Sequence, residues 1–425
     1  MLTPISRYGV RVIPNTLQIL DELDARGQLI EGPHIERFEH AFAARLGDVR
    51  AISTSYGRMA FYYILKALDL PTGGEIVFPA LTFWVMPEIA RQVGLTPVFA
   101  DVDPVTFNLT AAAMRRTITS RTVAVVPTHL WGLPCDMDDI VSVAARHGVA
   151  VIEDCAHALG ALYRQRPVGT FGDAAIFSFQ TFKPLNAYGG GMAIVRDAVL
   201  GERVACLVKR DPPPSLKRVR QRLWQGRVMR LATRPDVFKW TLFPLLYAGS
   251  RLGWSVDMYF WEAIRPLNPL PEDYRERISN AQAAIALEGL ARLGDWTAVR
   301  QRHAKRMTEL FDGVRGLRVP FVPAGRTHVF YQYCVYVPAR DAVVDACLRR
   351  GVDLETLHVD VCPELSLFGP GQRPAPGAHQ TTSTIQVPIY EVLTDTQLDS
   401  IADAVRDAVL SLVPQQPGAA VRASS

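Results

Sequence analysis

Two short segments of the sequence place an acid and an amine where a parallel β-sheet would bring them together. Residues 151–160 read Val-Ile-Glu-Asp-Cys-Ala-His-Ala-Leu-Gly, so Asp154 and His157 follow an apolar run. Lys183 follows another apolar run, at residues 174–177. A lysine amine forms a covalent bond with an aldehyde, and a carboxylate keeps a pyridine nitrogen protonated so that the ring acts as an electron sink. The pair therefore points to a site for pyridoxal 5′-phosphate.

Each of these residues alone has a simpler interpretation. An Asp at a strand end often caps a helix, and a Lys is usually exposed on the surface. The joint pattern, rather than either residue, favours the cofactor.

The elements that must position these residues lie between about residues 49 and 195. Short apolar runs alternate there with segments of helix length, and the runs are residues 75–78, 123–126, 149–152 and 174–177. This pattern is typical of an α/β fold, a mostly parallel sheet with helices on both faces. Ligands of such sheets bind at the carboxyl ends of the strands. We therefore expect a large cofactor-binding domain over residues 1–200.

A smaller α+β domain is expected over residues 276–425. An amphipathic helical run covers residues 278–293, and later segments predict a strand at 331–337 and helices at 341–350 and 398–412. The tail from Pro414, rich in Pro, Gln, Ala and Ser, is expected to fray.

Between these domains, residues 201–275 form a basic, Trp-rich insertion. Ten basic residues and two acids lie between Lys209 and Lys239, and four of the seven tryptophans lie in the insertion: Trp224, Trp240, Trp254 and Trp261. Cationic and aromatic residues together are typical of a segment that lies on an anionic membrane, so we predict a peripheral membrane contact through residues 209–261. The alternative is a helical excursion that packs on its own domain or on a dimer, with its arginines toward solvent or a substrate diphosphate.

Composition excludes several classes of protein. The 425 residues are 48% hydrophobic and 21% charged, which is typical of a globular chain rather than a disordered one. A net charge of +4 and the lack of a recognised module argue against nucleic-acid binding. Six scattered cysteines without a CxxC pair predict neither zinc nor a disulfide framework. With no secretory signal or bilayer-length apolar run, a cytoplasmic location is expected.

Taken in order, the motifs resemble those of the DegT-type sugar aminotransferases, which are fold-type I pyridoxal phosphate enzymes. The segments that carry the resemblance are residues 32–39, 79–83, 98–104, 127–137, the Asp154 and Lys183 segments, 277–284 and 387–390. The resemblance implies that Lys183 binds the cofactor aldehyde and then moves a proton between the cofactor carbon and the sugar carbon. It also implies that Asp154 pairs with the pyridine nitrogen.

Three more residues take cofactor-binding roles by the same resemblance. His157 would contact the phenolic oxygen or the ring face, and its alternative is a histidine packed at a strand end. Phe83 would stack on the ring, and its alternative is simple burial in the core. Ser178 would bind the phosphate through its hydroxyl.

The sequence departs from the family at the phosphate site and near the substrate. Tyr56-Gly57-Arg58 replaces the usual Ser-Gly-Thr before a helix over residues 59–68. Gly57 still lets the backbone and the helix N-terminus approach an anion. Arg58 would replace the missing hydroxyl with a bidentate contact, or else point to solvent. Gly189 stands where relatives carry an acid, and Arg275 replaces an Asn that reaches the neighbouring subunit's phosphate.

The resemblance implies an aminotransferase that moves an amino group from an amino acid, L-glutamate by analogy, to a keto sugar on a nucleotide or lipid diphosphate. It also implies a homodimer whose sites lie at the subunit interface. Lys183 argues against relatives that carry His there and dehydrate sugars. A pyridoxal phosphate lyase or dehydratase, an aminotransferase for a non-sugar ketone, and a non-catalytic scaffold remain as alternatives.

Overall fold

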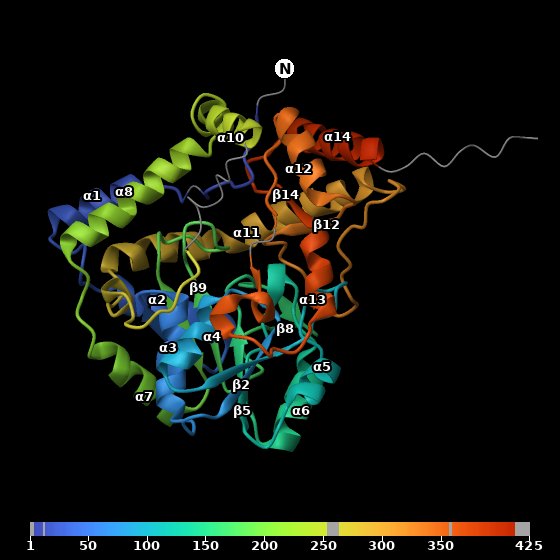
Figure 1. The fold of residues 1–425 in the computed structure, drawn as a ribbon. Helices are drawn as coiled ribbons and strands as arrows, with labels where there is room; N and C mark the ends of the chain where they lie inside the picture. The colour runs from blue at the N-terminus through green and yellow to red at the C-terminus, as the bar shows by residue number, and fades with distance from the viewer. Residues whose placement is uncertain (1–3, 12, 253–262, 357–358, 413–425) are drawn as a thin grey trace, which may run out of the picture.

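A seven-stranded sheet forms the centre of the computed structural model, which describes residues 4–11, 13–252, 263–356 and 359–412 (Figure 1). Its strand order is β1, β10, β9, β6, β5, β2, β4. Strand β10 runs antiparallel to both of its neighbours, and the other pairs are parallel. The strands span β1 Arg50–Thr54, β2 Glu75–Pro79, β4 Thr96–Ala100, β5 Thr122–Val125, β6 Ala150–Asp154, β9 Ala174–Ser178 and β10 Gly191–Val195.

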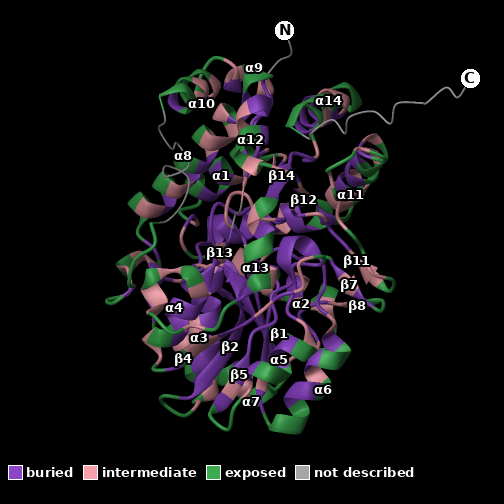
Figure 2. Ribbon diagram, turned by 45° about the vertical axis from the view of Figure 1, so that its right-hand side comes forward, coloured by how far each residue is buried: buried purple, intermediate pink, exposed green. Residues whose placement is uncertain are grey.

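Helices cover both faces of the sheet, as the apolar runs predict. Ile76 and Phe78 pack on one face, while Val77 between them packs on the other. The first face is covered by α3 (Gly57–Leu68), α4 (Val85–Gln92) and α7 (Ala198–Lys209). The second is covered by α2 (His34–Leu46), α5 (Ala111–Thr117), α6 (Met137–His147) and the first half of α11 (Asn280–Leu310). Figure 2 shows the buried strands between the partly exposed helices.

The C-terminal region has its own apolar core. Antiparallel strands β12 (Tyr333–Tyr336) and β14 (Thr384–Val387) pack with α12 (Arg340–Arg349) and α14 (Asp395–Leu412). Strand β12 is shorter than the strand expected at 331–337, and helix α11 extends well past residue 293, where the expected helical run ends. The expected mostly parallel sheet with a smaller α+β region is thus confirmed.

The N-terminal segment, residues 4–11, packs on this C-terminal region rather than on the sheet. Ile5 pairs with Val352 and belongs to the same apolar cluster. The remaining elements are α1 (Thr16–Ala25), α8 (Leu216–Ala232), α9 (Pro235–Phe238), α10 (Leu242–Arg251), α13 (Pro376–Gln380), β3 (Leu81–Thr82), β7 (Leu162–Tyr163), β8 (Arg166–Pro167), β11 (Arg326–Thr327), β13 (Asp360–Val361) and the short 3-10 helices Leu130–Gly132, Glu272–Tyr274, Cys362–Glu364, Ser366–Phe368 and Thr381–Ser383.

Helices α8 to α10 make up the described part of the basic segment. Helix α8 packs against α1 and α11 through Val219 and Leu223, and α10 packs on α12, where Leu246 meets Leu348. Trp254, Trp261 and the tail from Pro414 lie outside the described residues. No described helix is both long and apolar enough to span a bilayer. Because α7 packs on the sheet, the chain leaves the sheet only after Lys209. The domain limits 1–200, 201–275 and 276–425 stay predictions.

One close backbone contact joins β10 to the start of α3. A Cβ atom at Gly191 would lie 2.3 Å from the backbone nitrogen of Gly57.

Gly191→Ala should therefore destabilise the fold by about 1–3 kcal/mol, because backbone atoms cannot move aside as a flexible side chain can. Urea unfolding would measure this, with Gly294→Ala as control. Gly294 lies in α11, and apart from its own stretch of helix no described atom lies within 4 Å of its Cβ position, so Ala there should stabilise the fold by about 1 kcal/mol. Equal midpoints for Gly191→Ala and the wild type would contradict the prediction.

Candidate active site

A cavity of about 380 Å³ opens at the carboxyl ends of β6 and β9. Its wall includes seven of the eight predicted cofactor-binding residues, which come from four separate segments: Gly57, Arg58, Phe83, Asp154, His157, Ser178 and Lys183. Gly189 also lines the cavity, and Asp154 is the one carboxylate among the described lining residues. The eighth, Arg275, pairs instead with buried Asp211 at 3.1 Å and is half-exposed. A role for it toward a partner's phosphate stays a prediction.

Asp154 is the last residue of β6 and is buried. The backbone N–H of Ala156 donates to its Oδ1 at 3.0 Å. Burial raises the pKa of Asp154 above its ordinary value, although this hydrogen bond and the charge of Lys183 oppose the rise. A buried carboxylate of this kind is well suited to pair with a protonated ring nitrogen, since that cation would offset the cost of burial.

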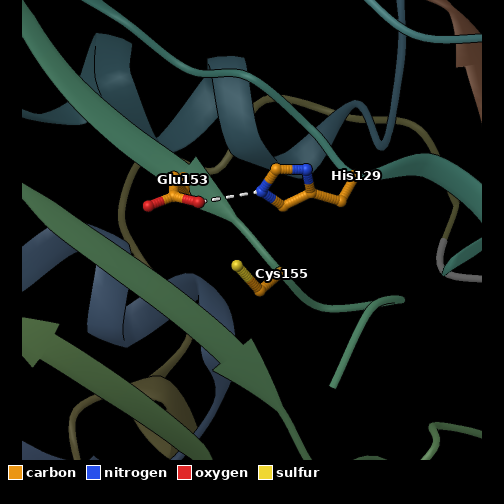
Figure 3. A group of neighbouring side chains, drawn as sticks. All are labelled: His129, Glu153 and Cys155. Carbon is orange, nitrogen blue, oxygen red and sulfur yellow. Dashed lines mark hydrogen bonds and ion pairs between the residues drawn. The ribbon is translucent and has the colours of Figure 1, made fainter. Parts of the chain in front are cut away.

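A buried polar cluster supports the end of β6 (Figure 3). His129 Nε2 lies 3.0 Å from Glu153 Oε2, and the other ring nitrogen accepts from the backbone N–H of Cys135 at 3.0 Å. Glu153 also accepts three backbone N–H groups from residues 169–172. Although these two side chains and Cys155 have the spacing of metal ligands, their hydrogen bonds already engage the His and Glu atoms. The backbone N–H of His129 donates to the carbonyl of Asp154, so the cluster positions that residue.

The Lys183 amine is buried in the cavity wall. Its pKa is lowered to about 8, mainly by burial, while the charge of Asp154 raises the pKa and the charge of Arg58 lowers it. Its Nζ lies 5.1 Å from the ring centroid of Tyr331. At pH 7 about a tenth of this amine is therefore neutral, far more than for an ordinary lysine, and the neutral amine is the form that attacks an aldehyde.

The backbone next to Lys183 is held by the N-terminal segment. Arg11 donates to the Lys183 carbonyl and pairs with Glu391 at 2.7 Å. Glu391 in turn pairs with buried Arg300 at 3.2 Å.

His157 lies between two aromatic rings. The Trp131 ring is 5.5 Å away and inclined by 14°, and the Tyr331 ring is 4.4 Å away and inclined by 28°. These two stacking contacts leave the edge of the imidazole as the part best placed to meet a ligand in the cavity. This geometry favours the contact with a phenolic oxygen over the contact with a ring face.

The predicted phosphate cradle is built from two strand and helix ends. A Cβ at Gly57 would lie 3.0 Å from both the Phe177 carbonyl and Ser178 Cβ, so glycine lets the first turn of α3 approach Ser178. The backbone N–H groups at the start of α3 and the Ser178 hydroxyl thus border the same space, a combination that suits a phosphate.

Arg58 is buried, so the alternative in which it points to solvent does not fit this position. Its guanidinium lies between three rings, 5.4 Å from Tyr56 and Phe83 and 5.0 Å from Tyr274, and it donates to the Tyr274 hydroxyl. Phe83 is half-buried in the cavity wall, as a ring-stacking residue would be. A phosphate contact of Arg58 stays a prediction.

Sequence reasoning missed several lining residues, among them Tyr331, Arg222 and Gln225. Tyr331 comes from the C-terminal region, and the other two come from α8. No local motif marks them, because only the tertiary fold brings these segments to the cavity. The one signal was the high density of arginines in residues 209–239.

Known proteins share both this sequence pattern and this fold. The pattern of the DegT/DnrJ/EryC1/StrS aminotransferase family matches residues 12–231 and 253–406. The chain belongs to that family. The match omits residues 232–252, which hold α9 and α10.

Two sequence relatives and one crystal structure illustrate the likeness. The chain is 30% identical to the spore coat polysaccharide biosynthesis protein SpsC of Bacillus subtilis, over 92% of this chain and 94% of that protein. It is also 30% identical to the UDP-N-acetyl-3-dehydro-alpha-D-glucosamine 3-aminotransferase of Acidithiobacillus ferrooxidans, over 92% and 91%. The crystal structure of the aminotransferase TlmJ from Streptoalloteichus hindustanus superposes with a TM-score of 0.77 at 27% identity, covering 96% of this chain and 99% of TlmJ.

The protein is a pyridoxal phosphate-dependent aminotransferase. Its own residues fit the cofactor, because the cavity offers a buried amine, a buried carboxylate and a glycine cradle at a helix N-terminus. When bound, the cofactor supplies an aldehyde and an electron-withdrawing ring.

The lowered pKa of Lys183 leads to a test on the apoenzyme. The rate of reaction with pyridoxal, which lacks the phosphate, should rise with pH and reach half its maximum near pH 8, as the amine loses its proton. Arg58→Met should move this midpoint to higher pH, because the cation that lowers the pKa is gone. Arg164→Met, an exposed control outside the cavity, should leave it in place. An unchanged midpoint in Arg58→Met would contradict the prediction and show that Arg58 does not lower the pKa of Lys183.

Proposed function

We propose that the protein transfers an amino group from L-glutamate to a keto sugar carried on a diphosphate. The observation that carries the proposal is the Lys183 amine, buried in one cavity with the Asp154 carboxylate and the Gly57 cradle. The relative from Acidithiobacillus ferrooxidans, whose name states a UDP-linked keto sugar, supports a nucleotide carrier. SpsC supports a place in polysaccharide biosynthesis.

Each residue has a distinct task in this proposal. Lys183 Nζ takes the proton from the reacting carbon and returns it, which suits an amine whose pKa lies near 8. Asp154 keeps the ring nitrogen protonated, and His157 holds the phenolic oxygen through the edge of its imidazole. Phe83 covers the ring, while Ser178, Gly57 and Arg58 hold the phosphate.

The donor half of the reaction can be tested with absorbance spectra. Protein loaded with pyridoxal phosphate should show the band of the covalently bound cofactor, and L-glutamate should convert it to the pyridoxamine form. Lys183→Ala should show no such band, whereas Lys305→Ala, an exposed control, should match the wild type. A band that no amino acid converts would contradict the aminotransferase proposal and favour a lyase or a scaffold.

We also propose that the protein is a cytoplasmic homodimer. Half-exposed Arg275 directly follows Tyr274, which contacts Arg58 at the cavity wall, so a partner seated here would be close to a site. Light scattering should give twice the mass of one chain. A fully active monomer would contradict the dimer.

A peripheral membrane contact through α8 to α10 is the last part of the proposal. Trp224 and Trp240 are 65% and 78% exposed, and Leu245, close to Trp240 in sequence, is also exposed. Cations such as Lys217, Arg234 and Arg251 are exposed on the same helices or next to them. Exposed tryptophans with flanking cations favour an anionic lipid surface.

Flotation with anionic vesicles tests this contact. The wild type should float, and the double variant Trp224→Ser, Trp240→Ser should remain at the bottom, because most of the apolar contact is lost. Leu410→Ser, an exposed position on α14, is the matched control. Equal flotation of the wild type and the double variant would contradict the proposed membrane contact.

A further inference from the structure

Helix α8 contributes two polar side chains to the active-site cavity. Arg222 and Gln225 both line it, and residues three apart on a helix are neighbours on one face. Arg222 is 11% exposed, whereas Gln225 is exposed. The two therefore form a short polar path from the rim inward.

One side of the Arg222 guanidinium is already held. Its Nη2 donates to the Tyr56 hydroxyl at 2.9 Å, and the carboxylates of Asp273 and Glu276 lie 3.5 and 3.7 Å away. Both carboxylates are shared, because Asp273 also accepts from Tyr56 and Glu276 pairs with Arg218. These contacts hold the guanidinium in place beside the cavity.

The other side of the guanidinium has no such partner. Arg222 Nη1 is buried and has no hydrogen-bond partner among the residues that the structure describes. A buried N–H of a cation without a partner costs free energy, so this position suits a ligand that brings an acceptor. In the proposed function, Arg58, Ser178 and the start of α3 hold the cofactor phosphate. Arg222 is a further cation.

The distance of α8 from the cavity is set by packing. A Cβ at Gly226 would lie 1.9 Å from the ring of Tyr188, itself a lining residue. The helix backbone thus lies directly on the loop that follows Lys183, with Arg222 one turn before this contact.

We infer that Arg222 and Gln225 form a binding site for the diphosphate that links the acceptor sugar to its carrier. This inference rests on the proposed function, in which the acceptor is a diphosphate-linked sugar. A guanidinium with one free edge gives charge-assisted hydrogen bonds to phosphate oxygens, and the Gln225 amide adds a neutral donor nearer the rim. Nucleotide and lipid carriers share this diphosphate, so the site accepts the chemistry of either.

Calorimetric titration of the cofactor-loaded protein tests the site with three probes: inorganic pyrophosphate, uridine 5′-diphosphate and geranyl diphosphate. Arg222→Gln should weaken binding of all three by about 10- to 100-fold, since a charge-assisted contact is lost. Arg220→Gln is the matched control, because Arg220 lies on the same helix but pairs with Asp24 at the surface. Tighter binding of uridine diphosphate than of pyrophosphate supports the site with a nucleotide carrier, and tighter binding of geranyl diphosphate supports it with a lipid carrier.

Two results would overturn the inference. One is equal diphosphate affinity in the wild type and Arg222→Gln. The other is a loss of cofactor retention in Arg222→Gln as large as its loss of diphosphate affinity, because Arg222 would then serve the cofactor. Diphosphate binding is measured without an amino donor, so it stays informative even if L-glutamate fails to convert the cofactor.

Discussion

The buried charge of Lys183 is the constraint on which the rest of the site depends. A lysine without water loses much of its preference for the protonated form, and its pKa falls to about 8 as a result. Asp154 opposes that fall and Arg58 adds to it. The carboxylate, in turn, is buried at a strand end and needs a cation nearby. The amine and the acid thus limit each other's protonation, and both must be held in place for the balance to persist.

The fold holds them with two different kinds of support. Strand β6 holds Asp154 at its carboxyl end. The neighbouring His129 and Glu153 side chains, which bond to each other and to backbone N–H groups, support that end of the strand. Lys183 lies in a loop, and its backbone is held instead by an ion-paired arginine from a distant part of the chain. A regular sheet thus positions the acid, whereas long-range ionic contacts position the amine. The rings of Trp131 and Tyr331, which stack on the imidazole, position His157.

Much of this arrangement follows from the sequence. Asp154 and Ser178 end strands that are apolar on both faces, so a parallel sheet must place them at the same edge, and the structure does so. The fold class, which is confirmed, was predicted from this alternation of apolar runs with segments of helix length. By contrast, Tyr331, Arg222 and Gln225 reach the cavity through packing between elements far apart in the chain, which has no local pattern. The buried orientation of Arg58 was also undecided, because it depends on three rings from separate segments. The roles of the cavity residues toward cofactor and sugar stay predictions.

The N-terminal segment has a consequence for the order in which the protein acquires its structure during synthesis. Ile5 bonds to the backbone of Gly351 and Asp353, and Arg11, which holds the Lys183 loop, pairs with Glu391. Ile5 and Arg11 therefore leave the ribosome long before residues 351–391, which contain their partners. Contacts of such sequence separation form late, since the chain between them must first be brought together. The sheet and its Asp154 can form while the chain is still growing, but the support of the Lys183 loop is completed only once the C-terminal region has emerged and folded.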